Sequence, residues 1–215
     1  MPLITQKKKL HAHAKALQHF KKNDPILAHG IQKMGLSDLK SRPAPNLFTP
    51  LLSSIIYQQL AGSAAKAIHG RVVALFKNQG TLDPSEFMAM RETQLRAAGL
   101  SQNKMLALKD LAAKCINGTI PTIQQAKQMT DEELVELLTQ VRGIGPWTVH
   151  MLLIFVLGRK DVMPSADYGV RNGYARLYRK RALPKPKDLE KHAERWRPYR
   201  SIASWYLWRV VDTKL

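Results

Sequence analysis

The sequence has 215 residues, 45% of them hydrophobic, and 34 Lys and Arg against 16 Asp and Glu. This composition indicates one large domain or two closely packed lobes, and it excludes a disordered basic tail. The formal net charge of +18 points to a polyanionic partner, although a basic solvated surface, as in many ribosome-associated proteins, also explains the charge taken alone.

Cysteine content and hydropathy exclude several kinds of site and location. The single cysteine, Cys115, excludes an internal disulfide and a four-cysteine metal or iron–sulfur site, and we expect it to be a small buried hydrophobe. No apolar run approaches the roughly 20 residues that span a bilayer. The basic first residues lack the apolar stretch of a secretory signal. We therefore expect a soluble protein in a reducing compartment.

Apolar residues recur at three- and four-residue spacing through most of the chain, whereas the alternation typical of strands is scarce. A Pro-rich connector at residues 41–50 separates an N-terminal part from the rest. The pattern predicts an all-α fold. Helices are predicted over residues 8–22, from Asp24-Pro25 to about Gly35, after Asp83-Pro84, and on both sides of Gly99. The spacing within residues 51–76 is typical of helix packed on helix.

Two predicted helices meet at a Gly-Ile-Gly corner, residues 143–145. Thr130 and Glu133 form a capping box that begins the first helix, and Gly143 is expected to end it as a C-terminal cap. Pro146 suits the first turn of the second helix, which is predicted over residues 147–157. The apolar stripe of the first helix is formed by Leu134, Leu137, Leu138 and Val141.

The glycine corner is a candidate phosphate-binding turn. At the start of a helix the backbone N–H groups have no partner within the helix, and they attract anions. Gly143 and Gly145 are both expected to supply unusual φ angles and the absence of a side chain that close approach requires. The alternative is an ordinary helical hairpin in which the glycines only turn the chain.

Asp167 follows Pro164-Ser165 and precedes a predicted helix, so its simplest role is that of N-cap. A capping carboxylate is rigidly held and keeps its charge, which makes the position compatible with catalysis as well. Asp161 lies beside Arg159 and Lys160, and a surface ion pair with them explains it.

Five stretches together cover most of residues 50–210 and resemble one family. They are VRGIGPWTVHMLLIF, MPSADYGV, SIIYQQLAGSAAKAI, LRAAGLSQNKMLALKDLA and RWRPYRSIASWYLWRV. In order and spacing they are similar to the helix-hairpin-helix superfamily of DNA base-excision glycosylases, more narrowly to the DNA-3-methyladenine glycosylase II group. The resemblance implies a single domain, residues 1–215, of two packed helical lobes with a cleft between them. It places the helix-hairpin-helix at about residues 131–158 and packs the N-terminal and C-terminal helices together.

The resemblance also assigns roles to residues. Asp167 takes the place of the catalytic aspartate, and Gly143, Ile144 and Gly145 form the phosphate-binding hairpin. The family hairpin often holds a monovalent cation, Na+ or K+, through main-chain carbonyls, and no other cofactor is implied. The carbonyls here belong to Thr139, Val141 and Ile144.

Base extrusion and base recognition have their own implied residues. The turn that pushes a wedge into the duplex is Gln58, Gln59, Leu60 and Ala61, with Leu60 as the wedge. The base pocket is implied to contain Trp147, Trp208, Met151 and Tyr57. Core packing is the alternative for each tryptophan.

Departures from the family pattern are informative. Relatives that also cut the backbone carry a lysine just after the hairpin. This chain has Trp147 there, so no lyase step is expected. Met151 stands where some relatives place a pocket aromatic, and residues 1–45 are too short and too helical for the N-terminal β-lobe of longer members.

Residues 170–200 contain eleven Lys and Arg against three acidic residues. Lys185 and Lys187 fit a solvated loop. A DNA phosphate-tracking face is expected from Arg171, Arg176, Arg179, Lys180 and Arg181.

The resemblance thus implies a monofunctional DNA glycosylase that removes alkylated purines from duplex DNA. It is expected to act as a monomer and to have no membrane partner. We expect it in the cytoplasm of a bacterium or the nucleus of a eukaryote. A non-catalytic helix-hairpin-helix module explains the charge and the corner but leaves Asp167 and the tryptophans without a role. A basic RNA-binding protein explains the charge only.

Overall fold

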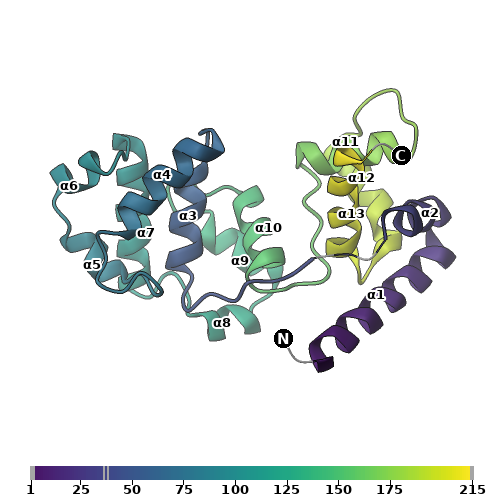
Figure 1. Cartoon of the computed structure of the whole chain (residues 1–215), viewed down its shortest axis with the longest axis horizontal. Coiled ribbons are helices and arrows are strands. Elements are labelled where there is room, and N and C mark those ends of the chain that lie inside the picture. Colours follow the sequence, from purple (N-terminus) through teal and green to yellow (C-terminus); the bar gives the residue numbers. More distant parts are fainter. Residues whose placement is uncertain (1–2, 36, 38, 214–215) are drawn as a thin grey trace. The chain divides into compact units, whose positions relative to one another are not determined.

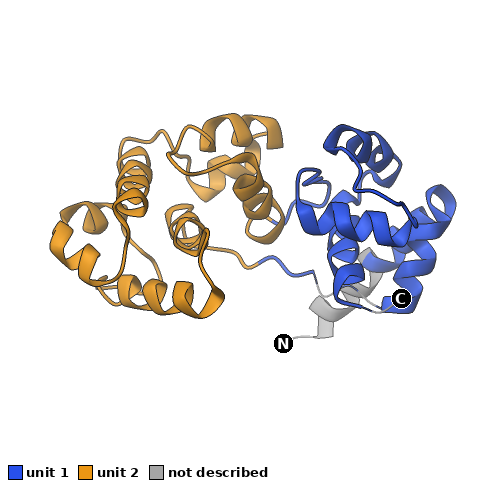
Figure 2. Cartoon of the chain, turned by 90° about the horizontal axis from the view of Figure 1, so that it is seen from above, with its two compact units in different colours: residues 1–41, 158–215 blue, residues 42–157 orange. Residues whose placement is uncertain are grey.

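The computed structural model describes residues 3–35, 37 and 39–213, and for residues 3–12 the backbone alone. Every element of regular secondary structure in these ranges is helical (Figure 1), which confirms the predicted all-α class. The chain divides into two compact units (Figure 2): unit 1 has residues 1–41 and 158–215, and unit 2 has residues 42–157. Within the described ranges no helix is long and apolar enough to cross a membrane.

Unit 1 is built from both ends of the chain. Its core contains Phe20 from the N-terminal part and Trp196 and Tyr206 from the C-terminal part, all fully buried. The N-terminal helices therefore share one core with the last helices. The elements are α1 (Leu3–Asn23), α2 (Pro25–Met34), α11 (Tyr168–Leu177), α12 (Pro186–Ala193), the 3₁₀ helix η1 (Glu194–Trp196) and α13 (Arg200–Asp212).

Helices α11 and α13 pack closely because α11 lacks a side chain at the crossing. A Cβ on Gly173 would lie 1.8 Å from the backbone oxygen of Leu207. No side chain fits in that space, so Gly173 allows the two backbones to touch.

A buried carboxylate ties the start of α2 to the C-terminal elements of unit 1. Asp24 is 3% exposed, and its Oδ1 accepts the Leu27 N–H as the N-cap of α2. Its Oδ2 accepts the Tyr178 hydroxyl (2.6 Å), the Trp196 indole N–H (2.8 Å) and a bond from His192 Nε2 (3.0 Å). The charge is thus buried with a full set of donors, which is what its burial requires.

Unit 2 buries the apolar faces of α3, α7 and α10 against each other and their neighbours. Leu52 and Ile56 of α3, Leu111 of α7 and Leu153 of α10 are fully buried. The helix starts predicted at Pro84 and Asp131 are confirmed. The elements are α3 (Phe48–Tyr57), α4 (Gly62–Val73), α5 (Pro84–Ala89), α6 (Glu92–Ala97), α7 (Gln102–Ile116), α8 (Ile123–Gln128), α9 (Asp131–Leu138) and α10 (Pro146–Phe155).

Cys115 lies near the end of α7 as a free thiol and is only partly buried, not fully buried as predicted. Burial raises the pKa of its thiol to about 11. It is therefore a poor nucleophile at neutral pH. Among the described residues no group of three or more His, Cys, Asp or Glu could hold a metal ion.

Candidate active site and DNA-binding turns

Asp167 is the N-cap of α11, as predicted. A tight turn precedes it, with the Asp167 N–H donating to the Pro164 carbonyl (2.9 Å). Its Oδ1 accepts the Val170 N–H at 2.8 Å, which satisfies one donor of the first helical turn. The carboxylate is thereby fixed at the positive end of a helix.

The indole of Trp208 holds the same carboxylate oxygen. Its Nε1 donates to Asp167 Oδ1 at 2.7 Å. Gly169 makes this contact possible, because a Cβ there would lie 2.8 Å from Trp208 Cδ1 and 3.2 Å from Asp167 Oδ1. The resemblance placed Trp208 in a base pocket, and the structure adds that its polar edge orients the aspartate.

Asp161, the other acidic residue of this segment, forms an ion pair as expected, but its partners are not the neighbouring Arg159 and Lys160. It instead accepts from Arg200 Nε (2.8 Å) and from Arg197 (2.8 Å). Its Oδ1 also accepts the Arg200 N–H at 3.3 Å, at the start of α13. Asp161 therefore fixes the beginning of α13.

Helices α9 and α10 form the hairpin, which runs from Asp131 to Phe155. The predicted capping box of Thr130 and Glu133 is present at its start. Helix α9 ends at Leu138 with Thr139 as its C-cap, so the expectation that Gly143 caps it is wrong. A separate turn follows, in which the Ile144 N–H donates to the Val141 carbonyl (3.0 Å).

The two glycines of the corner differ in their backbone conformations. Gly143 has φ +80°, the left-handed region that favours glycine. Gly145 has φ −104° and ψ 171°, an ordinary extended conformation, so the prediction of an unusual φ was wrong there. A Cβ on Gly145 would meet no other atom within 4 Å. The missing side chain at Gly145 leaves open space in front of the first turn of α10.

That first turn presents backbone N–H groups. Gly145 is the N-cap of α10 and has no side chain to cap it, and Pro146 occupies the first helical position. As at the start of any helix, the first N–H groups of α10 lack an i−4 carbonyl within the helix. Combined with the helix dipole, this is the arrangement that binds a phosphate.

Helix α7 anchors the hairpin turn, which the sequence did not reveal. Asp110 Oδ2 accepts the Arg142 N–H at 2.8 Å. Lys114 Nζ donates to the Gln140 carbonyl (2.9 Å) and to Asp110 (2.7 Å). The partners lie 26 to 32 residues apart, so no local pattern predicted them.

The predicted wedge turn connects α3 to α4. Gln59 has φ +54°, a strained value for a residue other than glycine, and the neighbouring Leu60 is 38% exposed. Gln58 Nε2 donates to the Gly143 carbonyl at 2.8 Å. The wedge turn and the hairpin, 85 residues apart, are therefore in direct contact. Ala61 is the N-cap of α4.

Three of the implied base-pocket residues lie in unit 2 and Trp208 lies in unit 1. Trp147 is 49% exposed and Tyr57 is 43% exposed, more than core packing would leave. Met151 is partly buried, one turn after Trp147 on α10. Trp147 and Tyr57 therefore have exposed ring surface to offer a ligand.

Of the basic residues in and just after α11, two donate hydrogen bonds to carbonyls of the fold. Arg171 Nε donates to the Pro184 carbonyl (2.8 Å), which holds the loop before α12. Arg176 donates to the Val211 carbonyl at 3.1 Å. Arg179, Lys180 and Arg181 are exposed.

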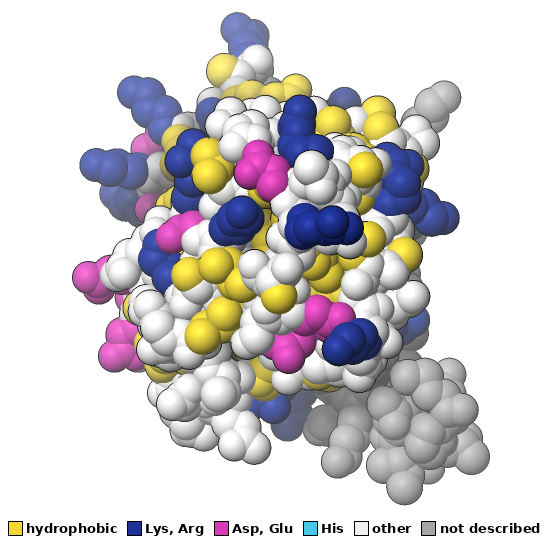
Figure 3. All heavy atoms as spheres, turned by 90° about the vertical axis from the view of Figure 1, so that its left-hand side faces the viewer, with side chains coloured by type: hydrophobic (Ala, Val, Ile, Leu, Met, Phe, Trp, Pro, Cys, Tyr) yellow, Lys and Arg dark blue, Asp and Glu magenta, His cyan; other side chains and the backbone are white. Residues whose placement is uncertain are grey.

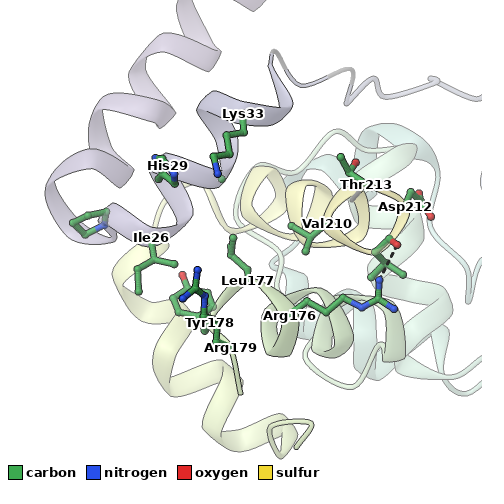
Figure 4. Close-up of a pocket in the computed structure, with 13 residues that line it drawn as sticks. Ile26, His29, Lys33, Arg176, Leu177, Tyr178, Arg179, Val210, Asp212 and Thr213 are labelled. Carbon is green, nitrogen blue, oxygen red and sulfur yellow. Dashed lines mark hydrogen bonds between the residues drawn. The ribbon is translucent and has the colours of Figure 1, made fainter. Parts of the chain in front are cut away.

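A pocket of about 1160 Å³ lies in unit 1 at the C-terminal end of α11 (Figure 4). Side chains of α2, α11 and α13 line it, with Leu177 and Val210 among its apolar residues and Lys33 and Arg179 among its basic ones. Asp167 is at the opposite end of α11, roughly 15 Å away for ten residues. None of the residues implied to act on a base lines this pocket.

Comparison with known proteins gives a consistent result. The family described as "HhH-GPD superfamily base excision DNA repair protein" matches residues 52–198. DNA-3-methyladenine glycosylase 1 of Schizosaccharomyces pombe is 43% identical over 163 residues, 76% of this chain and 72% of the relative.

Two solved structures extend the likeness to nearly the whole chain. The S. pombe 3-methyladenine DNA glycosylase in complex with abasic DNA is 37% identical with a TM-score of 0.82, covering 93% of this chain and 97% of that one. A DNA-3-methyladenine glycosidase from Bacillus halodurans is 31% identical with a TM-score of 0.83, covering 92% and 89%. This chain belongs to the HhH-GPD superfamily of base excision DNA repair proteins.

Proposed function

We propose that this protein is a monofunctional DNA glycosylase that takes alkylated purines out of duplex DNA and hydrolyses the N-glycosidic bond. The observation that carries the proposal is Asp167, a carboxylate held by the Val170 N–H and the Trp208 indole. The similarity to DNA-3-methyladenine glycosylase 1 supports the same activity. The product is an abasic site in DNA.

The reaction begins with extrusion, because a base stacked in a duplex is out of reach of any side chain. Alkylation at N3 or N7 of a purine gives the base a positive charge and weakens its bond to the sugar. The exposed ring of Trp147 can attract such a base by a cation–π contact, worth roughly 0.5 to 2 kcal/mol.

Asp167 then acts on the sugar. As the glycosidic bond breaks, positive charge develops on the ring oxygen and C1′, and a fixed carboxylate stabilises it. The same carboxylate accepts a proton from the water that attacks C1′. Because the alkylated base is already a good leaving group, little acid assistance is required.

Binding of the DNA backbone falls to the hairpin. The open space at Gly145 and the N–H groups at the start of α10 fit a phosphate oxygen without reading the sequence. Residues 143–157 contain no lysine, so this segment offers no amine to form a Schiff base with the sugar. This supports hydrolysis without strand cleavage.

We further propose that the carbonyls of Thr139, Val141 and Ile144 hold Na+ or K+ at the hairpin. The Val141 carbonyl already accepts the Ile144 N–H, and each carbonyl oxygen has a second lone pair for a cation. The ion would neutralise charge where a phosphate approaches. Replacing K+ with N-methylglucamine at constant ionic strength should weaken binding of duplex DNA, and an unchanged affinity would refute the site.

One assay tests the activity. The protein is incubated with duplex DNA methylated at adenine N3 and guanine N7, and both free bases and strand breaks are measured. Release of 3-methyladenine with intact strands is the expected result. Binding of DNA without release would favour a non-catalytic module, and release with cleavage would contradict the monofunctional assignment.

The same assay on DNA that also carries ethenoadenine and hypoxanthine defines the substrate range. We expect the cationic bases to be released faster than these neutral ones, because cation–π attraction and a weakened bond favour the former. Such an enzyme acts where DNA is, in the cytoplasm of a bacterium or the nucleus of a eukaryote.

A further inference from the structure

Helix α7 packs against α3 in unit 2 (Figure 1). It carries polar side chains that reach both turns implied to touch DNA. Near its start, Lys104 Nζ donates to the carbonyls of Ile56 (2.5 Å) and Gln58 (2.8 Å). Further along, Asp110 and Lys114 hold the hairpin turn at Arg142 and Gln140. These residues lie within an arc of roughly 120° on the helix surface, at 100° per residue.

The carbonyls that Lys104 contacts are at the C-terminal end of α3. The last carbonyls of a helix lack intrahelical partners and carry partial negative charge. An ammonium group at this end therefore supplies both a hydrogen-bond donor and a compensating positive charge. The partly buried ammonium reaches the carbonyl of the first residue of the wedge turn itself, Gln58.

Hydrogen bonds from Lys104 stabilise the wedge turn, whose backbone conformation is itself strained. Gln59 has φ +54°, and left-handed backbone at a residue with a Cβ is sterically strained. Gln58 reaches from this turn to the Gly143 carbonyl of the hairpin. A continuous chain of contacts therefore runs from Lys104 through Gln58 to Gly143.

We propose that Lys104 is a positioning residue that holds the wedge turn of Gln58 to Ala61 rigid and in register with the hairpin, so that Leu60 enters the duplex while the hairpin grips the backbone. This rests on the proposed function. A wedge must unstack a base pair, and a turn already ordered spends no binding energy on its own ordering. Lys104 acts through the turn and does not touch the reacting atoms.

The test compares base release by the wild type and by the variant Lys104→Met on two substrates. One duplex has the alkylated base fully paired, and the other has it opposite an abasic site, where extrusion is easier. Loss of a hydrogen bond from a charged donor corresponds to a roughly ten- to a hundredfold change in a rate or equilibrium constant. We expect single-turnover base release to fall by about that factor for the paired lesion and by less than about threefold for the unpaired one.

Lys109→Met is the matched control, because it removes the same charge from the same helix at a residue outside this contact chain. Both variants should bind undamaged duplex DNA equally. Lys104→Arg, which keeps the charge and the donors, should recover most of the release rate from the paired lesion. A thermal unfolding curve for each variant shows whether the fold is retained, and Lys104→Gln, which removes the charge but keeps a polar side chain, carries the same two-substrate comparison if Lys104→Met does not fold.

A double-mutant cycle with Leu60→Ala completes the design. Once the wedge is removed, Lys104→Met should cost nothing further in release from the paired lesion. Equal losses on paired and unpaired lesions, or full additivity with Leu60→Ala, would overturn the positioning role. A wild-type protein that releases no base from either duplex would instead refute the proposed function.

Discussion

The two units differ sharply in charge. Unit 1 contains 23 Lys and Arg against 8 Asp and Glu, whereas unit 2 contains 11 against 8. Fifteen of the eighteen net positive charges thus belong to unit 1. Figure 3, which views the side of α5 and α6, shows basic side chains interspersed with acidic and apolar ones. Yet the glycine hairpin and the wedge turn lie in the nearly neutral unit 2.

We infer from this difference two separate means of binding DNA. Unit 2 offers backbone N–H groups at a helix start, a short-range contact that depends on geometry. Unit 1 offers many exposed cations, which attract a polyanion at a distance and whose effect salt screens. Asp167, the proposed catalytic carboxylate, lies in the basic unit, where the Val170 N–H and the Trp208 indole fix its position.

The largest effect is expected at Asp167. Asp167→Asn keeps an oxygen for the Val170 N–H and the Trp208 indole, so the helix cap and the fold should survive. The loss of negative charge should lower single-turnover release of 3-methyladenine by about a thousandfold, while the Kd for duplex DNA does not rise. Asp188→Asn, which changes an exposed carboxylate of the same unit in the first turn of α12, is the control and should retain the release rate. A wild-type rate in Asp167→Asn would refute the assignment.

A second effect concerns the stability of unit 1 at low pH. Burial alone would raise the pKa of Asp24, but hydrogen bonds from His192, Tyr178, Trp196 and the Leu27 N–H outweigh it and lower the pKa to about 2. A folded-state pKa below the unfolded value of 3.8 means that the stabilisation is present above that value and is lost as pH falls towards 2. The contribution is about 2 kcal/mol of unfolding free energy.

The variant Asp24→Asn isolates the contribution of this carboxylate to the pH dependence of stability. At pH 6 the variant should be less stable than the wild type by about 2 kcal/mol or more, since a buried acceptor of three donors is replaced by an amide. The difference should shrink as the pH falls from 4 to 2. Chemical denaturation at a series of pH values measures it, and a constant difference would contradict the lowered pKa.

The sequence predicted contacts that are local and missed those that are distant. The capping box of Thr130 and Glu133 and the N-cap role of Asp167 each join residues three positions apart, so side-chain chemistry and spacing suffice. The bond between Trp208 and Asp167 spans 41 residues and depends on two glycines in α11 whose purpose is visible only in the packing.

The same limit explains the errors. Asp161 was paired with its neighbours in sequence, but the fold brings Arg200 to it from 39 residues away. Both corner glycines were expected to have unusual φ angles because composition does not distinguish a left-handed residue from one that only needs to lack a side chain. The structure separates these two requirements between Gly143 and Gly145.

That separation yields a matched pair of variants in unit 2. Gly145→Ala adds a methyl group with no protein atom within 4 Å, so stability should not change. The methyl group would obstruct the approach of a phosphate. Because about one hydrogen bond to the charged phosphate would then be lost, the affinity for duplex DNA should be roughly tenfold weaker. Gly143→Ala should instead lower the unfolding free energy by about 1 to 2 kcal/mol, because its φ is +80°. Equal affinity for Gly145→Ala and the wild type would argue against the hairpin as the phosphate contact.

The smallest effect tests the division of charge directly. Arg179→Gln removes an exposed cation from the basic unit, and Lys77→Gln removes one from unit 2. A phosphate contact contributes about 0.9 to the slope of log K against log salt concentration, so Arg179→Gln should flatten that slope by about one and weaken binding a few-fold at low salt. Lys77→Gln should leave the slope unchanged. If Lys77→Gln instead flattens it as much as Arg179→Gln does, attraction of DNA is shared by the whole surface, and the net charge of unit 1 has no special role in binding.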